Sequence, residues 1–275
     1  MKFRASEVAQ ITGHNPYQNA NQVFVRQWKK LDPSLPVGNA LLDDIGHLRA
    51  AVSREVDRLK GDDRADREQV ARAHRTLQRV EKLNSRSPSW SPTDADADAE
   101  LRELVREAPD AMATAVRRHA SGAVNCAFGV ATEDLATQRM VDLCGRPIGR
   151  RNDQLYTKLC DSGVTFVGMV DGYDEANECV VEIKNRRSPR IFYQPELPEY
   201  DVVQTHVYMY LLGCRKARLF QTYLTKSRED LVTFDDALWC EVVEKCLHFQ
   251  RRVEAAHQSS AESQRHILTG LLQTF

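Results

Sequence analysis

Two carboxylates and one amine stand in segments that are otherwise apolar, and together they could hold a metal ion. Glu182 and Lys184 lie in Val-Val-Glu-Ile-Lys-Asn at 180–185, and Asp171 lies in Gly-Met-Val-Asp-Gly at 168–172. Burying such charges is costly unless they are paired or bound to a metal. Carboxylate oxygens suit a hard divalent cation, and a nearby ammonium can steady a water molecule or a phosphate oxygen. The pattern predicts either such a metal site or an ordinary solvated ion pair on an edge strand.

A β-hairpin is expected to position these side chains. Residues 164–171 are apolar and β-branched, a turn is expected at 172–177, and residues 179–184 are apolar again. Side chains alternate between the faces of a strand, so Glu182 and Lys184 share one face and the apolar residues beside them point to the other. The acid at the end of the first strand would then face this pair.

Length and composition exclude several classes of protein. With 275 residues the chain can bury a full core, and its 38 Lys and Arg nearly balance its 39 Asp and Glu, so attraction to phosphate must come from local patches. No apolar run approaches the roughly 20 residues of a membrane span, and the first residues lack the apolar core of a signal peptide. The seven cysteines form no Cys-x-x-Cys pair, which argues against a zinc ribbon. No membrane partner is expected. We expect an intracellular location, either in the cytoplasm or, for a eukaryotic or viral protein, in the nucleus.

A single domain over 1–275 is expected, with a helical insertion near its start. Its N-terminal segment, 1–30, should hold a short helix from Ser6, a loop and a second helix. The insertion, 31–125, carries helical spacing at 41–59, 64–83 and 99–121, and a linker rich in Ser, Pro and Asp at 84–98. The alternating acids of this linker could suggest calcium, but it lacks the Gly and the distal Glu of an EF-hand, which favours a solvated linker.

The remaining elements predict an α/β (α+β) fold, in which helices flank a mixed central sheet. The core, 126–256, is followed by a C-terminal helix or tail at 257–275. The expected order is a helix at 129–143, strands at 155–159, 164–171 and 179–184, a helix at 201–212, a strand at 217–225, and a helix at 235–256.

Three segments in this order resemble the PD-(D/E)xK nuclease superfamily, and more closely its YqaJ-like viral recombinase or lambda-exonuclease-like family. The first is Arg-Ala-Ser-Glu-Val-Ala at 4–9, continued by Ile-Thr-Gly-His-Asn-Pro-Tyr at 11–17. The second is Gly-Val-Ala-Thr-Glu at 129–133, and the third is the acidic pair with its lysine, followed by Gln-Thr-His-Val-Tyr at 204–208. The resemblance covers 1–28 and about 126–225, and implies a restriction-endonuclease-like core.

The resemblance also implies a ligand set. Glu133, Asp171 and Glu182 would hold Mg²⁺, for which Mn²⁺ is expected to substitute, and the backbone carbonyl of Ile183 would complete the protein ligands. Lys184 would orient the attacking water or help to deprotonate it. Glu133 has an ordinary alternative, because a glutamate in the first turn of a helix also interacts favourably with the helix dipole. Whether one or two metal ions bind is left open.

Further residues are assigned to DNA by the same resemblance. Gln204 and Tyr208 share a helical face that would point at the site, with Gln204 touching the scissile strand or Lys184. The alternative for Tyr208 is plain packing within the helix. The arginine cluster that follows the lysine is either an ordinary solvated surface or, beside a phosphodiester site, a clamp for phosphates. The resemblance implies that the N-terminal segment grips DNA near the cleavage point. The additional DNA-binding candidates are Ser6, Asn15, Tyr17, Arg186, Arg187 and Arg190.

These features predict a metal-dependent DNA exonuclease that processes ends for recombination or repair. A structure-specific or restriction-like endonuclease and a catalytically silent DNA-binding relative remain alternatives. Related exonucleases carry a Trp and a phosphate-binding Arg before the Ala-Ser pair; here only five residues precede Ser6, and Arg4 or Arg26 would have to substitute. A single-strand annealing protein and a homo-oligomer are further partners that the family would allow.

Overall fold

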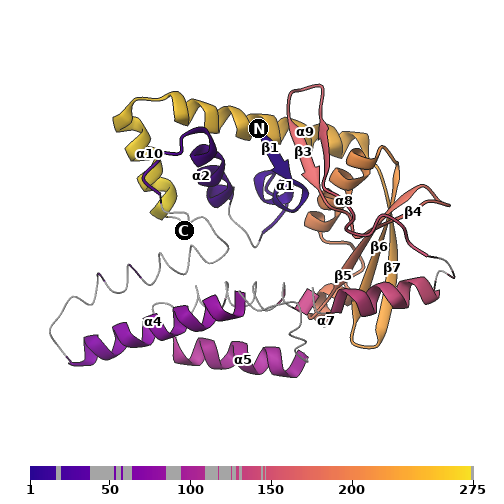
Figure 1. Cartoon of the computed structure of the whole chain (residues 1–275), viewed down its shortest axis with the longest axis horizontal. Coiled ribbons are helices and arrows are strands. Elements are labelled where there is room, and N and C mark those ends of the chain that lie inside the picture. The colour runs from indigo at the N-terminus through magenta and orange to yellow at the C-terminus, as the bar shows by residue number, and fades with distance from the viewer. Residues whose placement is uncertain are drawn as a thin grey trace. The chain divides into compact units, whose positions relative to one another are not determined.

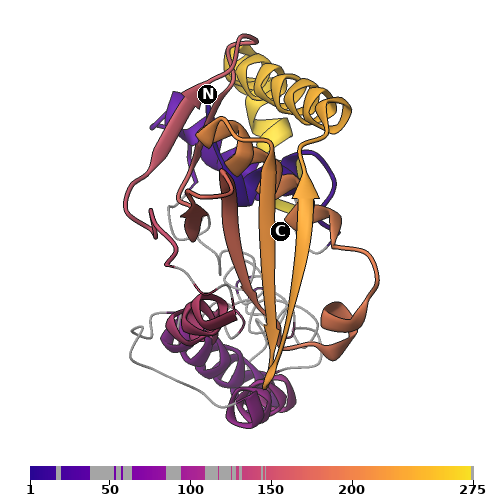
Figure 2. The same cartoon turned by 90° about the vertical axis from the view of Figure 1, so that its right-hand side faces the viewer.

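Four strands form a mixed sheet in the order β4-β5-β6-β7. β4 (Gly172–Asp174) pairs antiparallel with β5 (Cys179–Asn185), β5 pairs parallel with β6 (Lys216–Tyr223), and β6 pairs antiparallel with β7 (Lys226–Thr233). A parallel pair cannot be joined by a tight turn, so the chain crosses from β5 to β6 through two helices, α7 and α8. Figure 2 shows the long strands of this sheet side by side.

This computed structural model describes residues 1–16, 20–37, 53, 57, 64–84, 94–108, 117, 125, 128–129, 132–143, 145 and 147–273. The chain divides into two compact units. The first comprises Met1–Leu35 and Asp134–Leu272, and the second comprises Pro36–Glu133 and Gln273–Phe275. Among the described residues, none of the helices has the length and apolar content needed to cross a membrane.

A smaller sheet in the first unit joins the N-terminus to the middle of the chain. β1 (Lys2–Arg4) runs parallel to β3 (Thr165–Gly168), and β2 (Tyr156–Leu159) runs antiparallel to β3 on its other side. The first helix, α1 (Ala5–Ile11), follows β1 directly. The family-like opening segment is therefore built into the same unit as the acidic residues.

Helix α8 (Glu199–Leu212) packs against α1 and against strands of both sheets. It is apolar on most of its surface because it is enclosed on several sides. Gly213 ends it with a φ of 71°, a left-handed conformation that glycine adopts without a steric penalty. The predicted helix and its stop signal are confirmed.

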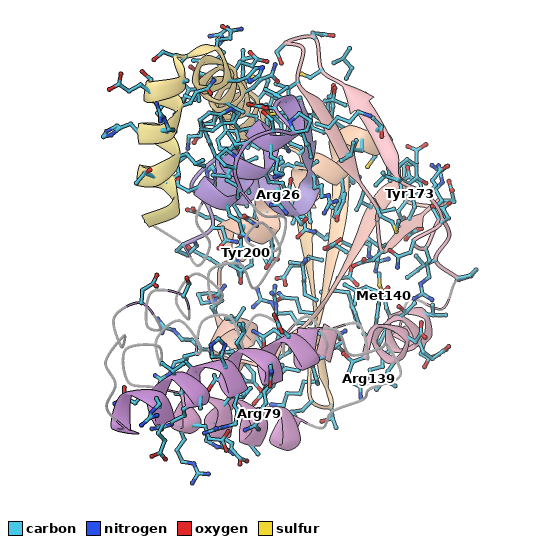
Figure 3. All side chains as sticks on the ribbon, turned by 60° about the vertical axis from the view of Figure 1, so that its left-hand side comes forward. Arg26, Arg79, Arg139, Met140, Tyr173 and Tyr200 are labelled. Atoms are coloured by element: carbon cyan, nitrogen blue, oxygen red, sulfur yellow. The ribbon has the colours of Figure 1, made fainter. Side chains whose placement is uncertain are left out.

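The opposite face of the four-stranded sheet is covered by the helix at residues 132–143. Its apolar side contributes Met140, labelled in Figure 3, to the core of the sheet. The β5 side chains in this cluster are Val181 and Ile183, which alternate along the strand with Glu182 and Lys184. The predicted alternation of faces is therefore confirmed. The buried cluster comprises Ala136, Met140, Val181, Ile183 and Phe220.

Three more helices close the first unit. α2 (Ala20–Leu31) and α1 pack against α9 (Asp236–Gln258), and α10 (Ala261–Gln273) follows at the C-terminus. The rings of Phe24 and Phe249 meet edge to face, with centroids 5.6 Å apart. α9 begins at an N-cap, Asp235, whose side chain accepts hydrogen bonds from the first turn, and the helix expected at 235–256 is present.

The second unit contains two packed helices, α4 (Arg64–Asn84) and α5 (Asp94–Glu107), which lie side by side in Figure 1. Arg72 on α4 donates to the backbone carbonyl of Arg106 at 2.9 Å, and Arg79 forms an ion pair with Glu107. The expected helix at 64–83 is thus present, whereas of the expected helix at 41–59 only Ser53 and Asp57 are described, and both are helical.

Two predictions of secondary structure were wrong. Residues 172–174 are strand β4 and not part of a turn, so the hairpin joins β4 to β5 and Asp171 lies just before β4. The expected linker at 84–98 is also too long, because its last residues, from Asp94, begin α5. The mixed α/β class, with helices on a mixed sheet, is confirmed.

Candidate active site

Asp171 is held against the edge of β5 by the backbone. The N–H of Ile183 donates to its Oδ2 at 2.8 Å. The β4–β5 ladder stops at the pair Gly172 and Val181, so this carboxylate replaces the next strand partner of Ile183. The N–H and C=O of one strand residue point to the same side. The carbonyl of Ile183 is therefore directed to the same edge as Asp171.

Glu182 is buried beside this carboxylate and carries an unsatisfied oxygen. Its side chain is 3% exposed; its Oε1 lies 2.7 Å from the Nζ of Lys184, while its Oε2 has no hydrogen-bond partner. Burial, and then the charge of Asp171, raise the pKa of Glu182 to about 8. Burial also raises the pKa of Asp171. Neither acid ionises as readily as an exposed carboxyl, and a bound cation would remove that penalty.

Lys184 remains charged in the same surroundings. Burial alone would lower its pKa, but the carboxylates of Glu182, Asp201 and Asp171 together raise it above the usual value for lysine. Its Nζ also donates to Oε1 of Gln204 at 2.9 Å. The site therefore offers a fixed ammonium beside two acids, one of which, Glu182, has an oxygen without a hydrogen-bond partner.

The chemistry of these groups fits a hard divalent cation. Two carboxyl groups and one backbone carbonyl are oxygen ligands of the kind that Mg²⁺ takes, and the unpartnered Oε2 of Glu182 is a buried acceptor that needs a partner. Among the residues that the structure describes, no three His, Cys, Asp or Glu side chains cluster as a metal site. Glu133 falls in the second unit, so its role as a third carboxylate ligand stays a prediction.

Gln204 and Tyr208 support the lysine from α8. Of the two contacts expected for Gln204, the structure shows the one with Lys184, and its Nε2 donates to the hydroxyl of Tyr208 at 3.0 Å. Tyr208 is buried, which raises the pKa of its hydroxyl. Its ring lies so close to Gly168 that a Cβ there would come within 2.7 Å of it. A buried ring packed in this way supports Gln204, and a contact of Tyr208 with DNA stays a prediction.

The arginines after the lysine do not share one environment. Arg186 is buried, and its guanidinium donates to Asp201 at 2.5 Å and to Gln221 at 2.7 Å. This pairing gives Arg186 a structural role that the sequence did not indicate, and its contact with phosphate stays a prediction. Arg187 is half-buried, and Arg190 is exposed on the short helix α7 (Pro189–Tyr193), so both remain phosphate-binding candidates.

Asp201 is the residue of the site that sequence analysis missed. It was assigned only to the start of a helix, whereas it is 1% exposed and lies between Lys184 and Arg186. A signal was present, because Asp201, Gln204 and Tyr208 follow one another at helical spacing and so share one face.

The N-terminal candidates belong to the first unit, but only some of them are described. Ser6 is exposed on α1 and Asn15 is half-buried, while Tyr17 lies outside the described residues. Arg26, labelled in Figure 3, forms an ion pair of 3.1 Å with the buried Glu7. That pairing gives Arg26 a structural role whether or not it also meets phosphate.

Comparison with known proteins finds similarity to solved structures. No family model and no curated protein matches the sequence. An alkaline exonuclease from Laribacter hongkongensis is 17% identical, with a TM-score of 0.41, over 70% of this chain and 92% of the other. A phage-related exonuclease from Haemophilus somnus 129PT is 11% identical, with a TM-score of 0.43, over 92% of this chain and 93% of the other.

Proposed function

We propose that this protein is a metal-dependent deoxyribonuclease that hydrolyses phosphodiester bonds at DNA ends. The observation that carries the proposal is the buried Oε2 of Glu182, which has no partner although it lies in a cluster with Asp171 and Lys184. Two acids and an ammonium at one edge of a strand are costly for the fold alone. They have a clear use where a hard cation and a phosphate must be held together.

Each residue has a distinct part in this proposal. Asp171, Glu182 and the carbonyl of Ile183 would hold Mg²⁺ or Mn²⁺, with Glu133 as the further ligand that the family resemblance supplies. The bound ion supplies an activated water and neutralises charge on the phosphate. Lys184, fixed by Glu182 and Gln204, would orient that water and stabilise the negative charge that develops in the transition state.

The DNA-binding surface is proposed from the residues beside this centre. Arg187 and Arg190 follow the lysine directly, and their charges would bind the backbone of the strand being cut. Ser6, Asn15 and Tyr17 are proposed to contact DNA near the cleavage point by family resemblance. The same resemblance supports a role in recombination or repair, an annealing protein as partner, and a homo-oligomer as the assembly.

A cleavage assay with four DNA substrates tests the proposal. Purified protein with Mg²⁺ is incubated with linear duplex bearing a 5′ phosphate, linear duplex bearing a 5′ hydroxyl, nicked circles and closed circles. We expect both linear forms to be degraded, the circles to survive, and EDTA to stop the reaction. Cleavage of closed circles would instead indicate the endonuclease, and no cleavage of any substrate would contradict the proposed activity.

Lys184→Ala, measured in the same assay, tests the assignment of the active site. We expect it to abolish Mg²⁺-dependent cleavage, because it removes the ammonium while leaving both acids in place. Lys226→Ala is the matched control, since Lys226 is exposed at the start of β7. Cleavage by Lys184→Ala at the wild-type rate would overturn the site assignment.

A further inference from the structure

A buried line of charges continues from Lys184 away from the two acids. Asp201, in the first turn of α8, lies between two cations: its Oδ1 is 3.7 Å from the Nζ of Lys184, and its Oδ2 accepts from Arg186 at 2.5 Å. Asp201 and Arg186 are 1% and 8% exposed. The lysine of the site thus lies beside a buried ion pair.

The line crosses the sheet and ends on the backbone after α7. Arg186 donates to Gln221 on β6 at 2.7 Å, and Gln221 donates to Asp230 on β7 at 2.7 Å. Arg228 binds the other oxygen of Asp230 at 2.6 Å. It also donates to three backbone carbonyls at the end of α7 and just after it, those of Phe192, Gln194 and Pro195. The far end of the line therefore fixes the segment that carries Arg190.

Stability alone does not account for this arrangement. Buried ion pairs are often no more stabilising than apolar side chains of the same volume, because desolvation offsets their attraction. Their directional bonds do, however, fix the positions of the groups that they join. An ammonium has three hydrogens, and around Lys184 the acceptors are Glu182, Gln204 and, at a longer distance, Asp201.

We infer that Asp201 is a positioning residue that holds the ammonium of Lys184 in its reactive place and links it to the α7 segment. The inference deepens the proposed nuclease function and rests on it. Glu182 would be drawn towards a bound cation, and its hold on the lysine would then weaken. Asp201 is not one of the proposed metal ligands, so its carboxylate, 3.7 Å from the ammonium, can hold the lysine in place when a cation is bound.

Asp201→Asn tests this inference with a matched control. The substitution keeps the size of the side chain and removes its charge. Asp236→Asn is the control, because Asp236 occupies the first turn of α9, is exposed, and pairs with Arg215 outside the site. Both changes remove an acid from the start of a helix, so a loss that arises only from the helix dipole would appear in both.

Single-turnover cleavage and DNA binding are measured for the three proteins, with Ca²⁺ replacing Mg²⁺ in the binding assay. We expect Asp201→Asn to cleave at least about tenfold more slowly, as is typical when a group that orients a reactive residue is lost. Its DNA-binding affinity and stoichiometry should stay within twofold of wild type. If the fraction of Asp201→Asn that binds DNA fell as much as its cleavage rate, the loss would reflect misfolding and would overturn the inference. Cleavage by Asp201→Asn at the wild-type rate would overturn it as well.

The ¹⁵N signal of the Lys184 ammonium gives a readout that needs no nuclease activity. We expect wild type to show a slowly exchanging signal, assigned by its loss in Lys184→Arg, and Asp201→Asn to lose it. Retention of that signal in Asp201→Asn would reject the positioning role. If wild type does not cleave DNA but the signal is still lost in Asp201→Asn, the proposed function is rejected. The positioning of Lys184 by Asp201 is then still supported.

Discussion

The backbone of Ile183 holds the carboxylate of Asp171 through a hydrogen bond of 2.8 Å, at the point where strand β4 stops pairing with β5. The acid is thereby placed by the sheet and not by its own rotamer alone. One oxygen satisfies the N–H that the short β4 leaves unpaired, and the group as a whole stays beside Glu182. The charge of this side chain can consequently be separated experimentally from its structural bond.

Asp171→Asn should make that separation. The amide keeps an oxygen for the N–H of Ile183, so we expect the thermal unfolding temperature of the metal-free protein to change little. The loss of a charged ligand should lower Mn²⁺ affinity and the cleavage rate by about 100-fold. Calorimetric titration with Mn²⁺ and the linear-DNA assay measure the two effects. The exposed Asp161→Asn serves as control, and full Mn²⁺ affinity in Asp171→Asn would exclude this residue as a ligand.

Glu182→Gln should stabilise the protein at pH 8 when no metal is present. Burial and the charge of Asp171 raise the pKa of Glu182 from 4.5 to about 8. Between these values the folded chain retains a proton that the unfolded chain has lost, so the free energy of unfolding falls as pH rises. Glutamine abolishes this fall, so we expect Glu182→Gln to be more stable than wild type at pH 8.

Urea unfolding in EDTA, repeated from pH 5 to pH 8, measures the effect. The two proteins should differ least at pH 5 and most at pH 8, and Glu182→Gln should be inactive throughout. A wild type whose stability does not fall relative to the variant over this range would show that Glu182 ionises freely in the fold. Added Mn²⁺ should stabilise wild type more than the variant, since it binds the ionised acid.

The elements that position the site could be predicted where a few consecutive residues determine the secondary structure. β5 alternates charged and apolar residues, and this alternation survives in the structure as two separate faces. α8 ends at Gly213 as its sequence indicates. In both cases the property lies within a few consecutive residues, and the tertiary structure reinforces it.

The elements that sequence analysis missed depend on distant contacts. β4 contains Gly172 and Asp174, which usually favour a turn, but Gly172 lies against the side chain of Ile148, where a Cβ would come within 2.3 Å of it. β7 is highly charged, and its Glu229 is neutralised by Arg218 of β6. Such pairings arise only once the strands are adjacent.

The environment of Arg186 in the arginine cluster could not be predicted from the sequence for the same reason. A run of basic residues is usually solvated, and nothing near Arg186 in the sequence distinguishes it from the arginines that follow. Its partners, Asp201 and Gln221, are 15 and 35 residues away. The buried ion pair was therefore not accessible to an argument from local pattern.

Gly168→Ala should weaken the support of the lysine from a distance. A Cβ at this position would lie 2.7 Å from the ring of Tyr208 and 3.1 Å from Leu211, and both of these side chains are buried. We expect a loss of about 1–3 kcal/mol in stability from overpacking, and slower cleavage because Gln204 loses its hold on the hydroxyl of Tyr208. Chemical unfolding and the cleavage rate measure the two effects.

Gly149→Ala is the matched control for this substitution. The nearest atom to a Cβ there is a backbone oxygen at 3.7 Å, which is ordinary van der Waals contact. Its stability and cleavage should therefore resemble those of wild type. Equal stability of the two alanine variants would show that the Tyr208 ring can move away from β3 without cost.

His206→Gln should remove an acid-sensitive part of the stability. His206 is buried in α8, where its Nε2 accepts from the backbone N–H of Asp235 at 2.9 Å and its Nδ1 lies 2.8 Å from the carbonyl of Val202. The ring must be neutral to accept the first of these bonds. Burial lowers the pKa of His206 below 6.5, so the unfolded chain takes up a proton before the folded chain does. The stability that His206 contributes is complete above pH 6.5 and declines as pH falls below it.

We therefore expect wild type to exceed His206→Gln in stability at pH 7.5, and the difference to shrink at pH 5. Urea unfolding at both values measures it, with the exposed His248→Gln as the control that separates this residue from general acid effects. A difference between wild type and His206→Gln that stays constant from pH 7.5 to pH 5 would mean that the ring takes up its proton equally well in the fold. In that case the bond to Asp235 could not be what joins α8 to the start of α9.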